Sequence, residues 1–108
     1  MSMPQPYLAS AMTRVEVDQN AAPTVLDFGT NWCGHCQAAQ PVVDAVLQRL
    51  PQIAHHKIED GKGRALGRSF RVTRWPTLIF LQAGIEVARL VRPTDASAIE
   101  QALQHLSA

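Results

Sequence analysis

The two cysteines are the residues of this sequence best suited to covalent chemistry. Cys33 and Cys36 are its only cysteines, and two residues separate them. A disulfide across so short a loop restrains little of the unfolded chain, so the pair is a poor structural staple. Three interpretations remain: a redox-active dithiol, half of a metal site, or two buried thiols that behave as small apolar side chains.

A tetrahedral zinc site would need two ligands besides the cysteines. His35 lies between the cysteines, where it would be strained as a ligand. His55 and His56 are adjacent, so their side chains point to opposite faces of any strand that contains them. His105 is the fourth histidine. We therefore expect no bound metal, and the redox interpretation is favoured.

The pattern around the cysteines places them where a buried strand meets a helix. Residues 24–28 form a short apolar run after Pro23, which is typical of a buried strand, and turn-like residues 29–32 follow. Apolar residues then recur at helical spacing until Leu50, and Pro41 should kink this helix. At the helix start, unpaired N–H groups and the helix dipole favour a Cys33 thiolate, the nucleophile of thiol–disulfide exchange. Cys36, one turn deeper, can then attack the mixed disulfide at Cys33.

Asp27 interrupts the apolar strand six residues before Cys33. A carboxylate buried in a strand that is covered on both faces is costly, so its presence there indicates a function. Such a group could accept a proton from Cys36 through a water. The alternative is a solvated Asp27 at the sheet edge, since strand alternation puts Val25, Asp27 and Gly29 on one face.

The remaining elements follow from capping and periodicity. Thr13 and Glu16 fit a capping box that opens a short helix ending near Asn20. The other expected elements are a strand over 53–58, a loop with a weak helix over 61–69, a strand over 77–81, a second hairpin strand over 85–91, and a last helix capped by Thr94 or Asp95. Strand–helix–strand order implies a parallel pair with a right-handed crossover, and the hairpin adds antiparallel strands at one edge.

Chain length and the order of the expected elements indicate one α/β domain over residues 1–108, with 1–12 as an irregular lead-in. The chain is 46% hydrophobic and 18% charged, which excludes a disordered, collagen-like or coiled-coil protein. A net charge of +1 gives no argument for nucleic-acid or membrane binding. Residues 1–8 lack the features of a secretory signal, so we expect a cytoplasmic protein.

Taken together, these residues resemble the thioredoxin family from about residue 23 onward. The resemblance is carried by Trp32-Cys33-Gly34-His35-Cys36, by Asp27 in its strand, by Pro41, by Pro76-Thr77 and by Gly84. It implies a thioredoxin fold, in which a central mixed sheet of about four strands is flanked by helices. It also implies a redox site at Trp32, Cys33 and Cys36, a cis Pro76 against the disulfide, and proton transfer assisted by Asp27. Lys57 would correspond to the lysine that neighbours this aspartate.

The sequence departs from typical thioredoxins near the cysteines. Gly34-His35 replaces their Gly-Pro and is similar to protein disulfide isomerase, and a protonated His35 would stabilise the Cys33 thiolate and make the disulfide a better oxidant. Arg74 and Arg92 would border the cysteines and favour acidic partner surfaces. Residues 59–64 are also unlike common thioredoxins. The expected substrate-binding residues are Trp32, Gly34, His35, Arg74, Trp75, Pro76 and Arg92.

The resemblance implies a protein disulfide oxidoreductase that needs no cofactor beyond its redox-active disulfide. Because the expected compartment is reducing, we expect a monomeric reductase of protein disulfides that is supplied with electrons by a thioredoxin reductase-like partner. We expect neither a nucleic acid nor a membrane as a partner. Two alternatives remain: a disulfide isomerase or oxidase, and a binding module or assembly chaperone that uses the fold without turnover.

Overall fold

The computed structural model describes residues 5–106. Helices and strands follow one another in the predicted order, which the structure confirms. The elements are α1 (Arg14–Gln19), β1 (Thr24–Gly29), α2 (Gly34–Leu47), β2 (Ala54–Glu59), α3 (Ala65–Ser69), β3 (Thr77–Gln82), β4 (Ile85–Val91) and α4 (Ala96–Leu103).

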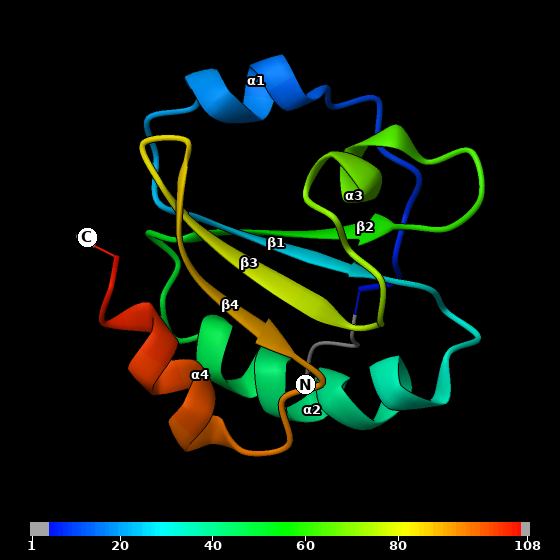
Figure 1. The fold of residues 1–108 in the computed structure, drawn as a ribbon. Helices are drawn as coiled ribbons and strands as arrows, with labels where there is room; N and C mark the ends of the chain where they lie inside the picture. Colours follow the sequence, from blue (N-terminus) through cyan, green and yellow to red (C-terminus); the bar gives the residue numbers. More distant parts are fainter. Residues whose placement is uncertain (1–4, 107–108) are drawn as a thin grey trace.

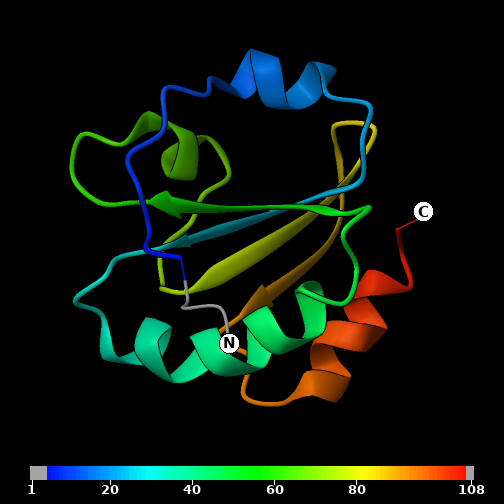
Figure 2. The ribbon, with the colours of Figure 1, turned by 180° about the vertical axis from the view of Figure 1, so that it is seen from behind.

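A four-stranded mixed sheet forms the centre of the fold, in the order β2-β1-β3-β4. Strands β1 and β2 are parallel, whereas β3 pairs antiparallel with both β1 and β4. Helices α1 and α3 cover one face of the sheet, and α2 and α4 cover the other (Figures 1 and 2). The predicted parallel pair with an antiparallel hairpin at one edge is therefore confirmed.

The two central strands are buried on both faces, so their side chains supply two apolar layers. Val25 and Phe80 pack with residues of α2 and α4, such as Val43. Leu26 and Ile79 point the other way and pack with residues of α1 and α3. Burial of each such side chain contributes roughly 1.5–3 kcal/mol. These layers fix the end of β1, from which the chain enters the cysteine segment.

Helix ends follow the predicted caps, with one difference in length. Thr13 and Glu16 form the expected capping box, and Asp95 rather than Thr94 caps α4. Helix α2 contains Pro41 and ends at Leu47 instead of Leu50. The backbone N–H of Leu50 bonds the carbonyl of Leu47 at 3.0 Å, so the last predicted turn is tighter than an α-helix.

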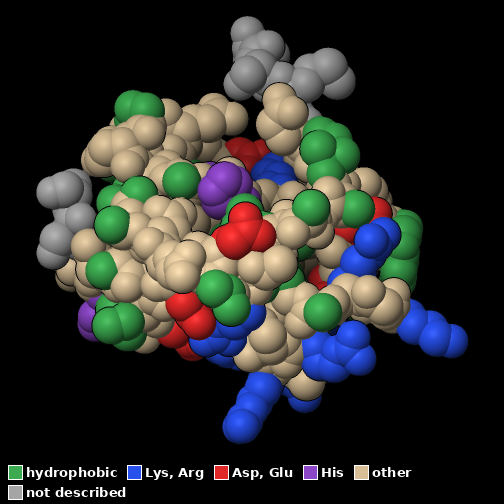
Figure 3. All heavy atoms as spheres, turned by 90° about the horizontal axis from the view of Figure 1, so that it is seen from above, with side chains coloured by type: hydrophobic (Ala, Val, Ile, Leu, Met, Phe, Trp, Pro, Cys, Tyr) green, Lys and Arg blue, Asp and Glu red, His purple; other side chains and the backbone are tan. Residues whose placement is uncertain are grey.

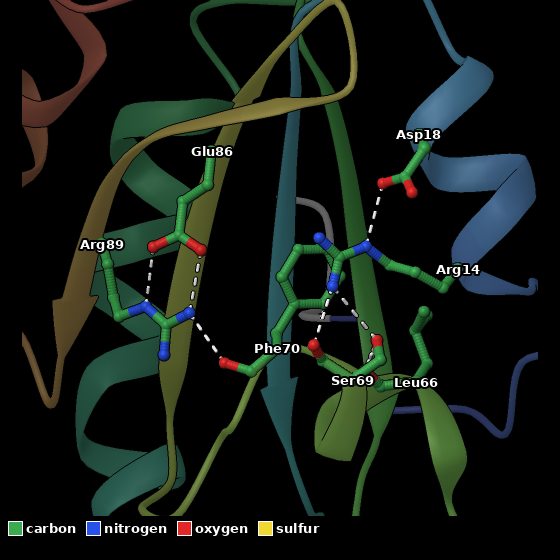
Figure 4. A network of polar contacts seen from close by, with 7 residues as sticks. All are labelled: Arg14, Asp18, Leu66, Ser69, Phe70, Glu86 and Arg89. Atoms are coloured by element: carbon green, nitrogen blue, oxygen red, sulfur yellow. Dashed lines mark hydrogen bonds and ion pairs between the residues drawn. The ribbon is translucent and has the colours of Figure 1, made fainter.

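A polar network anchors the short helix α3 to its neighbours (Figure 4). The Arg14 guanidinium donates to the Ser69 carbonyl at 2.7 Å and lies 3.8 Å from the centre of the Phe70 ring. From β4, Arg89 donates to the Phe70 carbonyl at 2.7 Å and pairs with Glu86 at 2.8 Å. These contacts hold a five-residue helix that propensity alone would not stabilise.

The chain before α1 crosses the edge of the sheet beside β2. Leu8 forms a parallel bridge with Ile58, and the segment passes from the α2 side of the sheet to the α1 side (Figures 1 and 2). Of the predicted lead-in over 1–12, residues 1–4 lie outside the described residues. Among residues 5–106, no helix has the length and apolar character needed to cross a membrane.

Candidate redox site

Cys33 occupies the N-cap position of α2, at the end of the turn that follows β1. Its sulfur accepts the backbone N–H of Cys36 at 3.3 Å and lies 3.9 Å from the Trp75 carbonyl oxygen. Both cysteines are free thiols. Cys33 keeps 8% of its surface exposed and Cys36 keeps none. The backbone N–H of the helix start therefore stabilises negative charge on the outer sulfur, and the inner sulfur lies behind it.

The Cys36 thiol is held in its protonated form. Burial, followed by the hydrogen bond with the Cys33 side chain, raises the pKa of Cys36 to about 12. A thiol in that state is not a nucleophile. A base must remove its proton before the inner sulfur can attack.

Asp27 lies in β1 and is 2% exposed, so the burial predicted from the sequence is confirmed and the solvated alternative is wrong. Its two carboxylate oxygens have different partners. Oδ1 accepts the Tyr7 hydroxyl at 2.8 Å, and Oδ2 lies 3.0 Å from His55 Nε2. These contacts offset the cost of burying the carboxylate.

Tyr7 closes the site from the N-terminal segment, and sequence reasoning gave it no role. Its side chain packs in one buried cluster with Cys33 and Cys36, and Trp75 lies against this cluster. Burial, together with the charge of Asp27, raises the pKa of the Tyr7 phenol, which stays protonated at every physiological pH. The sequence signal that could have identified it is weak, since it is only that Tyr7 is the single tyrosine of the chain.

The register of β2 determines which basic side chain reaches Asp27. Lys57 is the cross-strand partner of Asp27, yet its ammonium group bonds Asp44 Oδ2 at 2.9 Å and the Gln5 carbonyl at 3.0 Å. His55 supplies the contact to the aspartate instead. The lysine that the resemblance implies thus neighbours Asp27 in register, but its charge is paired with α2.

The predicted rim residues gather around Cys33 from three segments. The Trp75–Pro76 bond is cis, and the Trp75 carbonyl accepts Arg92 Nε at 2.9 Å while it faces the Cys33 sulfur. The rings of Trp32 and Trp75 meet edge to face with centroids 5.6 Å apart, and Trp32 is 75% exposed. An apolar surface with one arginine therefore borders the outer sulfur.

The other predicted rim residues project into solvent. Gly34 and His35 are exposed on the first turn of α2. Arg74 is exposed beside Trp75, and its backbone carbonyl accepts the Thr77 hydroxyl at 2.6 Å. On the face that carries α1 and α3, Lys and Arg side chains gather toward one side (Figure 3).

Asp60 gives the unusual 59–64 segment a structural role. Its carboxylate accepts Trp75 Nε1 at 2.8 Å, and its backbone N–H donates to the Gly29 carbonyl at 3.0 Å. Gly67 lies against this carboxylate, where a Cβ would collide with it. The segment fixes the orientation of Trp75.

Among residues 5–106 there is no group of three or more His, Cys, Asp or Glu residues able to hold a metal ion.

Comparison with known proteins identifies the family. The family model described as Thioredoxin matches residues 7–105, which is most of the chain. The chain belongs to the thioredoxin family. Thioredoxins are thiol–disulfide oxidoreductases, and the Cys33–Cys36 pair lies where such activity requires it.

Two curated thioredoxins and one solved thioredoxin structure illustrate the relationship. Thioredoxin 2 from Pseudomonas aeruginosa, in its reduced form, superimposes with a TM-score of 0.83 at 54% identity, over 94% of each chain. Thioredoxin-2 from Saccharomyces cerevisiae is 33% identical over 73% of this chain and 75% of its own length. Thioredoxin H2-1 from Oryza sativa is 30% identical over 76% of this chain, a match that spans 59% of the rice protein.

Proposed function

We propose that this thioredoxin reduces disulfide bonds in other proteins. The Cys33 thiolate attacks one sulfur of the substrate disulfide and displaces the other as a thiolate. Cys36 then gives up its proton and attacks the Cys33 sulfur. A Cys33–Cys36 disulfide forms, the second substrate sulfur leaves, and two electrons have passed from the dithiol to the substrate.

The observation that carries the proposal is the arrangement of the two sulfurs. Cys33 Sγ accepts the Cys36 N–H at 3.3 Å at the start of α2, and the Cys36 thiol is fully buried behind it. Asp27, buried nearby with both oxygens hydrogen-bonded, is the proposed acceptor of the Cys36 proton. An attacking sulfur, a resolving sulfur and a base are thus assembled within one site.

Substrate proteins would dock on the surface around Cys33. Its proposed members are the aromatic rings of Trp32 and Trp75, the backbone beside Pro76, the Gly34-His35 turn, and the guanidinium groups of Arg74 and Arg92. Aromatic side chains supply contact area at low entropic cost, and the arginines favour acidic partner surfaces.

The cellular setting completes the proposal. A cytoplasmic location, a monomeric state and regeneration by a thioredoxin reductase-like partner are consistent with net reduction, because cytosolic thiols are kept reduced. The exchange itself requires only the two cysteines and proton transfer, so we propose that the protein needs no cofactor.

The reductase proposal is tested by insulin disulfide reduction with dithiothreitol as the electron source. Cys33→Ser should abolish turnover, whereas Cys36→Ser should accumulate a mixed disulfide between Cys33 and substrate that mass spectrometry detects. Turnover that survives Cys33→Ser would overturn the proposal. A Cys33→Ser protein that retains its cellular function would instead identify a binding module or chaperone.

A disulfide isomerase or oxidase is the second candidate, and His35 favours it. This side chain is exposed on the first turn of α2, two positions after Cys33, where positive charge would stabilise the thiolate. Equilibration against glutathione and dithiothreitol gives the potential of the couple. A reduction potential of about −270 mV is typical of thioredoxins, and one of about −180 mV is typical of protein disulfide isomerase.

A further inference from the structure

The Tyr7 hydroxyl lies between the proposed base and the resolving cysteine. It donates a buried hydrogen bond to Asp27 Oδ1 at 2.8 Å. The same side chain packs against Cys36. Tyr7 is therefore in contact with both groups between which a proton must move.

Gly29 makes this close approach possible. A Cβ at position 29 would lie 2.6 Å from Cys36 Sγ and 2.8 Å from Tyr7 Cζ. Real Cβ atoms do not tolerate such distances, so any side chain larger than hydrogen would separate the sulfur from the phenol. The bare backbone at the end of β1 leaves the two groups in contact.

Hydrogen bonds on both sides fix the position of Tyr7. Its backbone N–H donates to Asn31 Oδ1 at 2.8 Å, and its carbonyl accepts Asn31 Nδ2 at 3.0 Å. The next residue, Leu8, donates to the Lys57 carbonyl at 3.3 Å and accepts the Glu59 N–H at 2.8 Å. Asn31 belongs to the turn before Cys33, so the phenol and the cysteines are positioned by the same turn.

We propose that the Tyr7 hydroxyl carries the proton from Cys36 to Asp27 when Cys36 resolves the mixed disulfide. The Tyr7 proton passes to Asp27 Oδ1 as the Cys36 proton passes to the Tyr7 oxygen. The Cys36 sulfur then forms the bond to Cys33 Sγ, and the Cys33–substrate bond breaks. Tyr7 ends neutral, Asp27 ends protonated, and the substrate leaves as a thiolate.

The groups that face Asp27 are consistent with this direction of transfer. His55 occupies Oδ2, so the oxygen directed at the cysteines is Oδ1. The Lys57 charge on β2 is paired with Asp44 of α2. Within residues 5–106, the carboxylate therefore meets no unpaired cation on the side that faces Tyr7.

This proposal rests on the proposed function, and its test separates the two steps of that function. A chromogenic aryl disulfide releases one coloured thiolate when Cys33 attacks and a second when Cys36 resolves. The first phase in stopped flow depends on reagent concentration, and the second does not. Tyr7→Phe should leave the first phase unchanged and slow the second by about 100-fold or more, since a positioned proton-transfer group typically contributes about 10²- to 10⁴-fold.

The pH dependence distinguishes proton transfer from a packing defect. Without the relay, resolution depends on the small fraction of Cys36 already ionised, so the second phase of Tyr7→Phe should rise about ten-fold per pH unit between about pH 7 and pH 9. The unaltered protein should show a much flatter profile. Ile79→Val, buried in the apolar layer on the other face of the sheet, is the control and should match the unaltered protein in both phases.

A double variant tests whether Tyr7 and Asp27 act as one unit. Asp27→Asn should also slow the second phase, and Tyr7→Phe added to it should have little further effect. Equal second phases in Tyr7→Phe and the unaltered protein would overturn the relay while leaving the oxidoreductase intact. Loss of the first phase in the unaltered protein would instead overturn the proposed function.

A second measurement does not depend on the folding of Tyr7→Phe. Because Tyr7 is the only tyrosine, biosynthetic incorporation of fluorotyrosines alters position 7 alone. Fluorination makes the phenol more acidic with little change of shape. The second-phase rate should change steadily across tyrosine, monofluorotyrosine and difluorotyrosine while the first phase stays constant. A second phase that is constant across the series would overturn the relay.

Discussion

The two thiols differ in reactivity because burial separates them. Cys36 is fully buried and has its pKa raised to about 12, whereas Cys33, at the start of α2, keeps 8% of its surface exposed. In Cys33→Ser, alkylation of Cys36 by iodoacetamide should therefore be slow at neutral pH and should rise about ten-fold per pH unit up to at least about pH 10. Cys36→Ser, the matched variant, should be alkylated readily at neutral pH. A plateau for Cys36 below about pH 9 would contradict the assignment.

His35 should tune the potential without forming the site. It is exposed two positions after Cys33, and its imidazole has no hydrogen-bond partner among the described residues. His35→Pro removes the imidazole, whose protonated form would stabilise the reduced thiolate. We expect the potential of the Cys33–Cys36 couple to fall by tens of millivolts, within the interval of about 90 mV between protein disulfide isomerase and thioredoxins. Equilibration with glutathione buffers measures it, and an unchanged or higher potential would exclude this role.

Strand β2 and helix α2 are joined by a buried ion pair. Lys57 Nζ lies 2.9 Å from Asp44 Oδ2, and their side chains are 6% and 11% exposed. Asp44→Ala would leave the buried ammonium group without a counter-charge, bonded only to the Gln5 carbonyl, which should lower the free energy of unfolding by about 3 kcal/mol. Glu100→Ala removes an exposed pair with Arg49 and should change it by less than about 1 kcal/mol. Urea denaturation measures the free energy of unfolding of both variants. An equal decrease in the two would show that the buried ion pair contributes no more to stability than the exposed one.

Elements were predictable where the signal is local. The capping box at Thr13 and the apolar run before the cysteines identified α1 and β1 from neighbouring residues alone. Strand β2 was placed, but its register was ambiguous, because a shift of one residue exchanges the faces of His55 and His56. The contact of His55 with Asp27 therefore could not be read from the sequence.

The same limit explains why Tyr7 was missed. It lies in a segment without helical or strand periodicity, twenty positions before Asp27 in the chain. Only the packing of the N-terminal segment beside β2 brings the two together. The cysteines, Asp27 and Pro76 belong to the pattern that carries the family resemblance, whereas Tyr7, His55 and Asp60 reach the site through tertiary structure.

The fold as a whole should lose stability at alkaline pH. Cys36 has an ordinary pKa of 9.0 that folding raises to about 12, so between these values the unfolded chain binds fewer protons than the folded one. The free energy of unfolding should fall there by on the order of 1 kcal/mol per pH unit. Folding also raises the pKa of Tyr7 above its ordinary value of 10.0, so Tyr7 contributes to the same fall at higher pH. Cys36→Ala should show a shallower decline in denaturation series from about pH 8 upward. If the free energy of unfolding falls with pH equally steeply in Cys36→Ala and in the unaltered protein, Cys36 is not the cause of the decline.

The two hydrogen bonds between the Asn31 side chain and the Tyr7 backbone also determine where a tag can be attached to the protein. A purification tag or fusion partner ahead of residue 5 would pull on the segment that carries the phenol. At the other end, α4 lies away from the start of α2 (Figure 1). Labels, surface anchors and fusion partners attached after α4 would leave the chemistry of the cysteines undisturbed, whereas the same additions at the front would act as unintended modulators of it.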